Sequence, residues 1–285
     1  MIQSTSTIFI ILIPMIDTSF FTFFEYAFIQ KAFIAGGFVA LTCATLGMFL
    51  VLRRMSLIGD GLSHVSFGAI ALGLFFGVYP LYIAVPVVMI GSYFILKITE
   101  KAKVYGDASI GIVSAVGISG GVILASLSKG FNVDLFSYLF GNILAISETE
   151  VIFSVTLSFL VLSMLYFFYW DLFSATFDEE YAKTTGIHTN FINILLTLLT
   201  AVTVVLSIKV VGVMLVSALL ILPSVSALQI ARGFKQALFL SILFSLLSVF
   251  FGIIFSFLFD IPAGATIVML SVIFFMLTLV YKKLG

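Results

Sequence analysis

The sequence predicts an all-α polytopic membrane protein with about nine transmembrane helices, within a range of eight to ten, and one short re-entrant segment. Hydrophobic side chains make up 62% of the 285 residues and charged side chains only 9%, whereas soluble domains carry about 25% charged residues. Apolar runs near the length of a bilayer span recur along the chain. They are apolar on every face, unlike barrel strands, and backbone groups in lipid must be satisfied within the segment, which favours helices.

The first 30 residues are predicted to be an interfacial or loosely ordered lead-in, and residues 31–285 a single transmembrane domain. The apolar piece Ile8–Ile16 is too short to span a bilayer and contains Pro14. It also lacks the basic flank of a secretory signal. The single cysteine, Cys43, lies in an apolar run, which excludes an intramolecular disulfide and indicates a small packing residue.

Charged residues and helix breakers divide the rest of the chain into nine candidate spans. They are Ala32–Leu52, Ser56–Gly77, Leu81–Leu96, Ala108–Ser128, Glu150–Tyr169, Phe191–Ile208, Gly212–Gln229, Ala237–Phe259 and Ala263–Val280.

A short apolar segment, LFSYLFGNILAIS at residues 135–147, lies between the fourth and fifth spans. As a helix it would reach only about 20 Å, which is short of a bilayer core of about 30 Å. If it does not cross, ten of the thirteen basic residues share one side, as the positive-inside rule favours. The segment is therefore expected to be re-entrant or a short pair of broken helices, with the N-terminus outside and the C-terminus inside. Non-helical backbone at that depth must be buried in protein or line a wet path, which indicates a channel or transporter.

Small residues spaced four apart suggest close contacts between helices. Gly73 and Gly77 form one such pair, and Gly117 and Gly121 form another. In lipid, close backbone approach supplies the attraction between helices.

Two ionisable residues, Asp60 and His64, stand near the start of an apolar span in the stretch RRMSLIGDGLSHVSFGAIALG, residues 53–73. Four residues apart, they share one helical face. Counted from Ser56 they sit about 6 and 12 Å into the span, where an isolated ion costs several kcal/mol and function is the default interpretation. A carboxylate and an imidazole suit a divalent cation such as Zn²⁺, Mn²⁺ or Fe²⁺, although two ligands do not complete a coordination shell.

Residue chemistry alone leaves two alternatives open for this pair. Asp60 could cap the helix while His64 bonds a neighbouring backbone group, because Ser and Asp favour first turns. The pair could also relay protons, because histidine titrates near neutral pH.

The longest hydrophilic stretch, DLFSATFDEEYAKTTGIHTN at residues 171–190, is placed inside by the charge distribution. It contains EEYAKTTG, which fits a short helix with acidic residues at its N-terminal end and Gly186 as its C-terminal cap. An ordinary solvated loop is the alternative. His188 is predicted to be a surface residue rather than a ligand.

Absent motifs limit the functions that this chain could perform by itself. No Gly-Lys dipeptide occurs, so there is no GxxxxGK[ST] phosphate-binding loop, and no HExxH zinc-protease helix occurs either. If the protein uses ATP, another chain must bind it. The zero net charge gives no indication of a nucleic-acid partner.

The segment LRRMSLIGDGLSHVSFGAIALG closely resembles the second-helix signature of permease subunits of bacterial metal-ion ABC importers, the zinc/manganese/iron family. The resemblance continues in order through four further stretches and covers about residues 25 to 280. They are DASIGIVSAVGISGGVILASLSKGFNVDLFSYLFGNILAIS, FDEEYAKTTGIHTNFINILLTLLTAV, VVGVMLVSALLILPSVSAL and DIPAGATIVML.

The resemblance implies a multi-pass permease in the bacterial plasma membrane that works as a homodimer with two cytoplasmic ATP-binding subunits. An extracytoplasmic metal-binding protein would deliver a divalent ion, and no cofactor would be bound permanently. The resemblance places Asp60 and His64 on the metal path and makes EEYAKTTG the coupling helix, with Glu180, Ala182 and Gly186 at its motif positions. Transport would follow alternating access. The stretch HVSFGAIALG is more similar to zinc-importing members than to manganese importers, and iron is a further possibility.

The alternative function is a proton- or ion-coupled secondary transporter with Asp60 and His64 as its relay. Such a protein would not need residues 171–190 to contact an ATPase.

Overall fold

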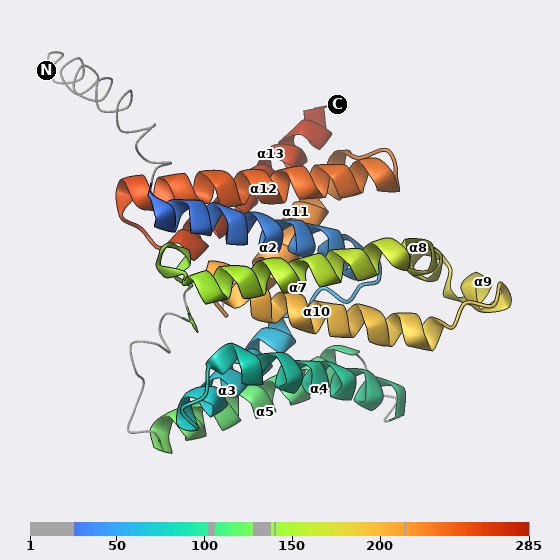
Figure 1. Ribbon diagram of the computed structural model, residues 1–285. Coiled ribbons are helices and arrows are strands. Elements are labelled where there is room, and N and C mark those ends of the chain that lie inside the picture. Colours follow the sequence, from blue (N-terminus) through green and yellow to red (C-terminus); the bar gives the residue numbers. More distant parts are fainter. Residues whose placement is uncertain (1–25, 102–105, 128–137, 140, 214, 285) are drawn as a thin grey trace, which may run out of the picture.

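The computed structural model describes residues 26–101, 106–127, 138–139, 141–213 and 215–284, and within these ranges every regular element is a helix (Figure 1). Among these residues, eight helices are long and apolar enough to cross a membrane, and a ninth apolar helix is shorter. This agrees with the prediction of about nine spans. Most of the predicted lead-in, residues 1–25, lies outside the described residues.

The element bounds follow the predicted spans closely in most cases. The long helices are α2 (Ala27–Leu52), α3 (Ile58–Phe75), α4 (Pro80–Lys101), α5 (Gly106–Leu127), α7 (Glu148–Phe167), α10 (Thr189–Val211), α12 (Phe234–Phe259) and α13 (Ala263–Leu284). The shorter elements are η1 (Ile143–Ala145), α8 (Tyr169–Phe177), α9 (Glu179–Thr184) and α11 (Val216–Ile230).

The helices form one bundle in which α2 and α10 are central (Figure 1). In the most apolar stretch of α10, 72% of the residues are buried, whereas in the most apolar stretch of α5 only 11% are buried. Polar side chains inside the bundle bond locally or across helices. Thr200 donates to the carbonyl of Leu196 on its own helix at 2.7 Å, and Cys43 Sγ of α2 lies 3.1 Å from Ser207 Oγ of α10. These bonds satisfy groups that would otherwise be costly to bury.

Serine side chains join α2 to α11 and α12 through backbone carbonyls. Ser241 of α12 donates to the carbonyl of Ala44 at 3.2 Å, and Ser245 donates to that of Ala40 at 3.0 Å. Ser224 of α11 lies 3.1 Å from Ser241. A Cβ added at Gly47 of α2 would meet the Leu220 carbonyl oxygen of α11 at 1.9 Å, so backbones touch here, as expected for helices packed in lipid.

The segment between α5 and α7 makes no net crossing, because α5 ends and α7 begins at the same end of the bundle (Figure 1). This confirms that the segment does not cross, as the distribution of basic residues predicted. Residues 135–137 and 140 of the predicted re-entrant segment lie outside the described residues. In the described part, the carbonyl of Tyr138 accepts a hydrogen bond from the backbone N–H of Val213 at 3.0 Å.

A break separates α10 from α11, and the predicted span Gly212–Gln229 is wrong at its start. Gly212 ends α10 with φ of +90°, and α11 begins only at Val216. Gly141, with φ of +74°, packs against this break: an added Cβ would lie 2.6 Å from the backbone carbon of Val211. The returning segment thus covers backbone that the broken helix leaves without helical partners.

Of the two glycine pairs, only one acts as a pair, although a Cβ at Gly73 of the other would lie 2.8 Å from Pro80 Cα of α4. A Cβ at Gly117 of α5 would lie 2.6 Å from Val65 Cα of α3, and one at Gly121 would lie 2.7 Å from the Phe67 ring. This confirms a close α3–α5 contact. The Gly73–Gly77 prediction is wrong, because Gly77 lies beyond the end of α3 with φ of +65°.

Basic residues gather at the bundle end that carries α8 and α9. Arg53, directly after α2, donates to Thr176 of α8 at 3.0 Å, and Lys282 of α13 donates to Gln229 of α11 at 3.0 Å. At the opposite end Lys31 pairs with Glu148 at 2.9 Å. The end with α8 and α9 is therefore the one that the positive-inside rule assigns to the cytoplasm.

Candidate metal path and coupling helix

The turn that leads into α3 is closed by two backbone hydrogen bonds and determines where Asp60 stands. The N–H of Arg54 bonds to the carbonyl of Val51 at 3.1 Å, and that of Met55 to the carbonyl of Leu50 at 2.9 Å. This is the Schellman arrangement, with Arg54 in the left-handed region at φ of +58°. α3 then begins at Ile58, so Asp60 lies in its first turn, where a carboxylate interacts favourably with the helix dipole.

Helix capping does not account for Asp60. The residue at the cap position of α3 is Leu57, and no side-chain hydrogen bond caps this helix. The carboxylate is therefore free to face the neighbouring turn, and the capping alternative raised from the sequence loses its support.

The structure brings Asp60 and His64 together. Asp60 Oδ2 lies 3.6 Å from His64 Nε2, with the two side chains 50% and 29% exposed, respectively. This separation exceeds a good hydrogen bond. Neighbouring faces of α3 are packed, since a Cβ at Gly59 would meet Leu220 of α11 and one at Gly61 would meet Ile110 of α5. The pair thus occupies the part of the α3 surface that a single chain leaves partly open.

One chain supplies only part of a metal site. In the portion of the chain that the structure describes, no group of three or more His, Cys, Asp or Glu side chains could hold an ion. A divalent cation held by Asp60 and His64 would need further ligands from water, backbone carbonyls or a second copy, since zinc sites carry about four ligands.

The predicted short helix in residues 171–190 is confirmed as α9. Asp178 precedes it, and its Oδ1 accepts a hydrogen bond from the N–H of Tyr181 at 2.9 Å, as N-cap residues do. The helix ends in a second Schellman arrangement: the N–H of Gly186 bonds to Lys183 at 3.2 Å, and that of Ile187 to Ala182 at 3.0 Å. The φ of +88° at Gly186 explains why glycine stands there.

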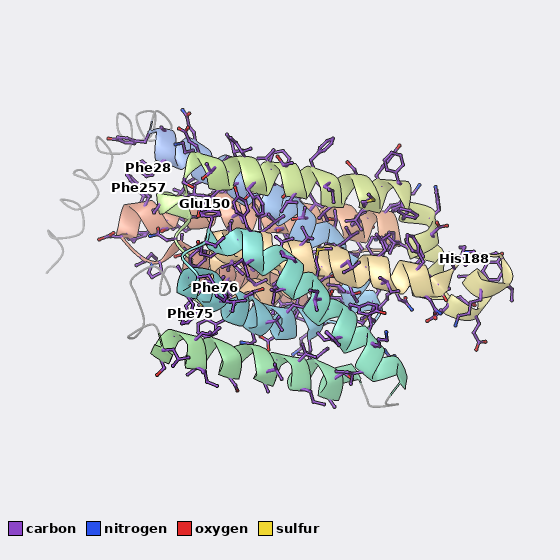
Figure 2. The ribbon with its side chains drawn as sticks, turned by 60° about the horizontal axis from the view of Figure 1, so that its bottom comes forward. Phe28, Phe75, Phe76, Glu150, His188 and Phe257 are labelled. Carbon is purple, nitrogen blue, oxygen red and sulfur yellow. The ribbon has the colours of Figure 1, made fainter. Side chains whose placement is uncertain are left out.

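The three motif residues, two in α9 and Gly186 just beyond its end, have different environments. Ala182 is fully buried, whereas Glu180 and Gly186 are exposed. α9 extends beyond the bundle (Figure 1), and His188 is exposed at the same end, as predicted (Figure 2). The helix therefore has an exposed face, while Ala182 belongs to the buried core of the bundle.

The sequence did not indicate α8, which follows α7 after Phe168 and leads to α9 (Figure 1). Its aromatic side chains pack on the start of α12, with the rings of Phe173 and Phe234 5.1 Å apart. Repeated aromatic residues in YWDLFSATF were the available signal, because aromatic rings favour the edges of a membrane.

The bundle of apolar helices, the ionisable pair on α3 and the projecting α9 together define a polytopic membrane transport protein. Residues 25–282 match the ABC 3 transport family, ABC-3. The chain belongs to this family.

Relatives of known sequence and structure are similar over nearly their whole length. The high-affinity zinc uptake system membrane protein ZnuB of Haemophilus influenzae is 35% identical over 91% of this chain and 99% of its own. The manganese transport system membrane protein MntC of Halalkalibacterium halodurans is 32% identical over 90% and 88%, respectively. Among solved structures, PsaBC of Streptococcus pneumoniae in complex with Fab has a TM-score of 0.81 at 31% identity, covering 89% of this chain and 91% of that one.

Proposed function

We propose that this chain is the membrane permease of an ATP-driven importer of divalent metal ions, with zinc as the first candidate and manganese or iron as the others. The observation that carries the proposal is the Asp60–His64 pair, 3.6 Å apart on one face of α3, in a chain of the ABC 3 transport family. The relatives named for zinc and manganese uptake support a metal as cargo.

In this proposal Asp60 and His64 contact the ion during its passage. The Asp60 carboxylate and the neutral His64 imidazole each donate an electron pair to a borderline divalent ion. Two ligands from one chain hold an ion less tightly than a closed four-ligand cage, so it can move on. Water and the same residues of a second copy complete the shell as the ion passes.

In this proposal an extracytoplasmic binding protein delivers the ion at one end of the bundle, and ATP is hydrolysed by subunits bound at the opposite end. We propose that two copies of the chain assemble with two cytoplasmic ATP-binding subunits, and that α9 docks on these subunits. The exposed Glu180 faces the partner, the buried Ala182 connects α9 to the bundle, and Gly186 fixes the exit of the chain. ATP binding and hydrolysis in the partner chains then rock the two copies so that access alternates.

The direct test is uptake of radiolabelled zinc and manganese by cells that carry or lack this protein. His64→Ala is expected to abolish uptake while the complex assembles normally. His188→Ala is the matched control, because His188 is the other histidine of the chain and lies exposed beside α9. Unchanged uptake by His64→Ala would refute the role of His64.

The energy source separates this proposal from a secondary transporter. In proteoliposomes containing the assembled complex, uptake is expected to stop when the ATP-binding subunits carry a hydrolysis-blocking substitution. Uptake should continue when an ionophore collapses the proton gradient. The reverse pattern would establish a proton-coupled mechanism and overturn the proposal.

A further inference from the structure

Arg53 is a partly buried charged residue that the proposed metal path and docking helix leave without a role. It follows the last residue of α2. Its Nε donates to Thr176 Oγ1 of α8 at 3.0 Å, and its Nη1 donates to Asn193 Oδ1 of α10. One guanidinium therefore joins three elements: α2, α8 and the cytoplasmic half of α10.

The same residue is tied rigidly to α3. Arg53, Arg54 and Met55 form the Schellman turn at the end of α2, and the N–H of Ile58, the first residue of α3, bonds to the carbonyl of Met55 at 3.1 Å. Asp60 follows within the first turn of α3. A displacement of the Arg53 guanidinium is therefore passed to α3, which carries Asp60 and His64, through only a few hydrogen-bonded residues.

One nitrogen of Arg53 has an unmet hydrogen bond in this conformation. Among the described residues, the buried Nη2 has no acceptor, and a buried donor without a partner is costly. Burial lowers the pKa of Arg53, and the charge of the nearby Glu179 opposes that shift. Glu179, the first residue of α9, instead pairs here with Lys183 at 3.0 Å. Glu179 follows Thr176, the partner of Arg53 Nε, by three residues, so an acceptor suited to Nη2 stands close along the chain, on the helix that would dock to the ATPase.

We propose that Arg53 is the positioning residue that connects α9 to α3, and that Glu179 exchanges Lys183 for Arg53 Nη2 when α9 moves. The exchange gives the connection two discrete arrangements, which is what physical coupling between distant sites requires. In one, α9 is held by its internal ion pair. In the other, Glu179 bonds to Arg53 Nη2 and pulls the turn that contains Arg53. This shifts the start of α3, and Asp60 and His64 move with it. This inference rests on the proposed function.

The test measures metal transported per ATP hydrolysed by the complex of this chain with its ATP-binding subunits and metal-binding protein in proteoliposomes. This ratio does not depend on how much complex folds, so a merely structural defect leaves it unchanged. Arg53→Gln is expected to lower the ratio about tenfold, as loss of a charged, buried hydrogen-bonding group would. Arg54→Gln is the control, because Arg54 is the adjacent arginine but is exposed, and its ratio should equal that of the wild type.

A second pair of variants tests the exchange without touching a buried group. Glu179→Gln, at a side chain 45% exposed, should lower the ratio about threefold, the effect of one partly exposed charge pair. Lys183→Gln removes the other of the two arrangements and should lower the ratio as well. A wild-type ratio in Glu179→Gln, or equal losses in Arg53→Gln and Arg54→Gln, would overturn the inference. If the wild-type complex moves no metal on ATP hydrolysis, the proposed function itself fails.

Discussion

The close approach of α3 and α5 beside His64 gives a quantitative prediction for Gly117→Ala. The added methyl group would lie 2.6 Å from Val65 Cα and 2.8 Å from the His64 carbonyl oxygen. These are backbone atoms of α3 and cannot rotate away. Since carbon atoms in contact stay about 3.5–4.0 Å apart, the two helices must separate by about 1 Å at this level. Overpacking of this kind costs about 1–3 kcal/mol.

The assay is thermal unfolding of the purified protein, combined with metal uptake per assembled complex. At about 2–4 °C per kcal/mol for large domains, Gly117→Ala should lower the Tm by about 2–12 °C. The substitution should also reduce metal uptake, because moving α3 away from α5 displaces the turn of α3 that carries His64. Gly120→Ala on the same helix is the control, since a Cβ there meets nothing within 4 Å. Equal Tm values for the two variants would refute the reasoning.

Three further predictions concern single contacts. Gly186→Pro should abolish co-purification with the ATP-binding subunits, because proline cannot adopt the φ of +88° and loses the N–H that bonds to Lys183. Gly186→Asn, which tolerates this region, should retain the partner, and a reversed result would contradict the role of the turn. Arg54→Gly should raise stability by about 1 kcal/mol in thermal unfolding by relieving a φ of +58°; an unchanged or lower Tm would count against strain there. Ser245→Ala should lower the free energy of unfolding by about 0.6 kcal/mol, the value of a typical interhelical hydrogen bond in lipid. Ser248→Ala should not lower it, because the buried hydroxyl of Ser248 has no partner among the described residues. Equal losses of unfolding free energy in the two variants would disprove the distinction.

Much of the fold could be predicted because the preference of an apolar helix for lipid is a local property of the sequence. The bounds of α12 and α13 depend on their own residues and flanking breakers, and prediction and structure nearly agree there. A break between the spans of α10 and α11 was predicted at residues 209–211, but its position after Val211 could not be predicted in the same way. Residues on both sides of it are apolar, and the backbone partner that stabilises it, Tyr138, comes from a distant part of the chain.

The same distinction applies to the candidate site. Asp60 and His64 meet because they are four residues apart on one helix, and the cap at Gly186 follows from a local turn, so both were visible in the sequence. The contacts of Arg53 were not, because its partners Thr176 and Asn193 lie 123 and 140 residues away. From the sequence, Arg53 served only to indicate which side of the membrane its loop occupies.

Because Cys43 is buried, the natural chain gives little background signal in thiol labelling. Its side chain is fully buried beside Ser207, where a thiol reacts poorly, and the chain has no other cysteine. A cysteine introduced at successive positions along the open face of α3 can therefore be modified selectively by water-soluble maleimides. Labelling rates with and without ATP would then show when each level of that face meets water from either compartment.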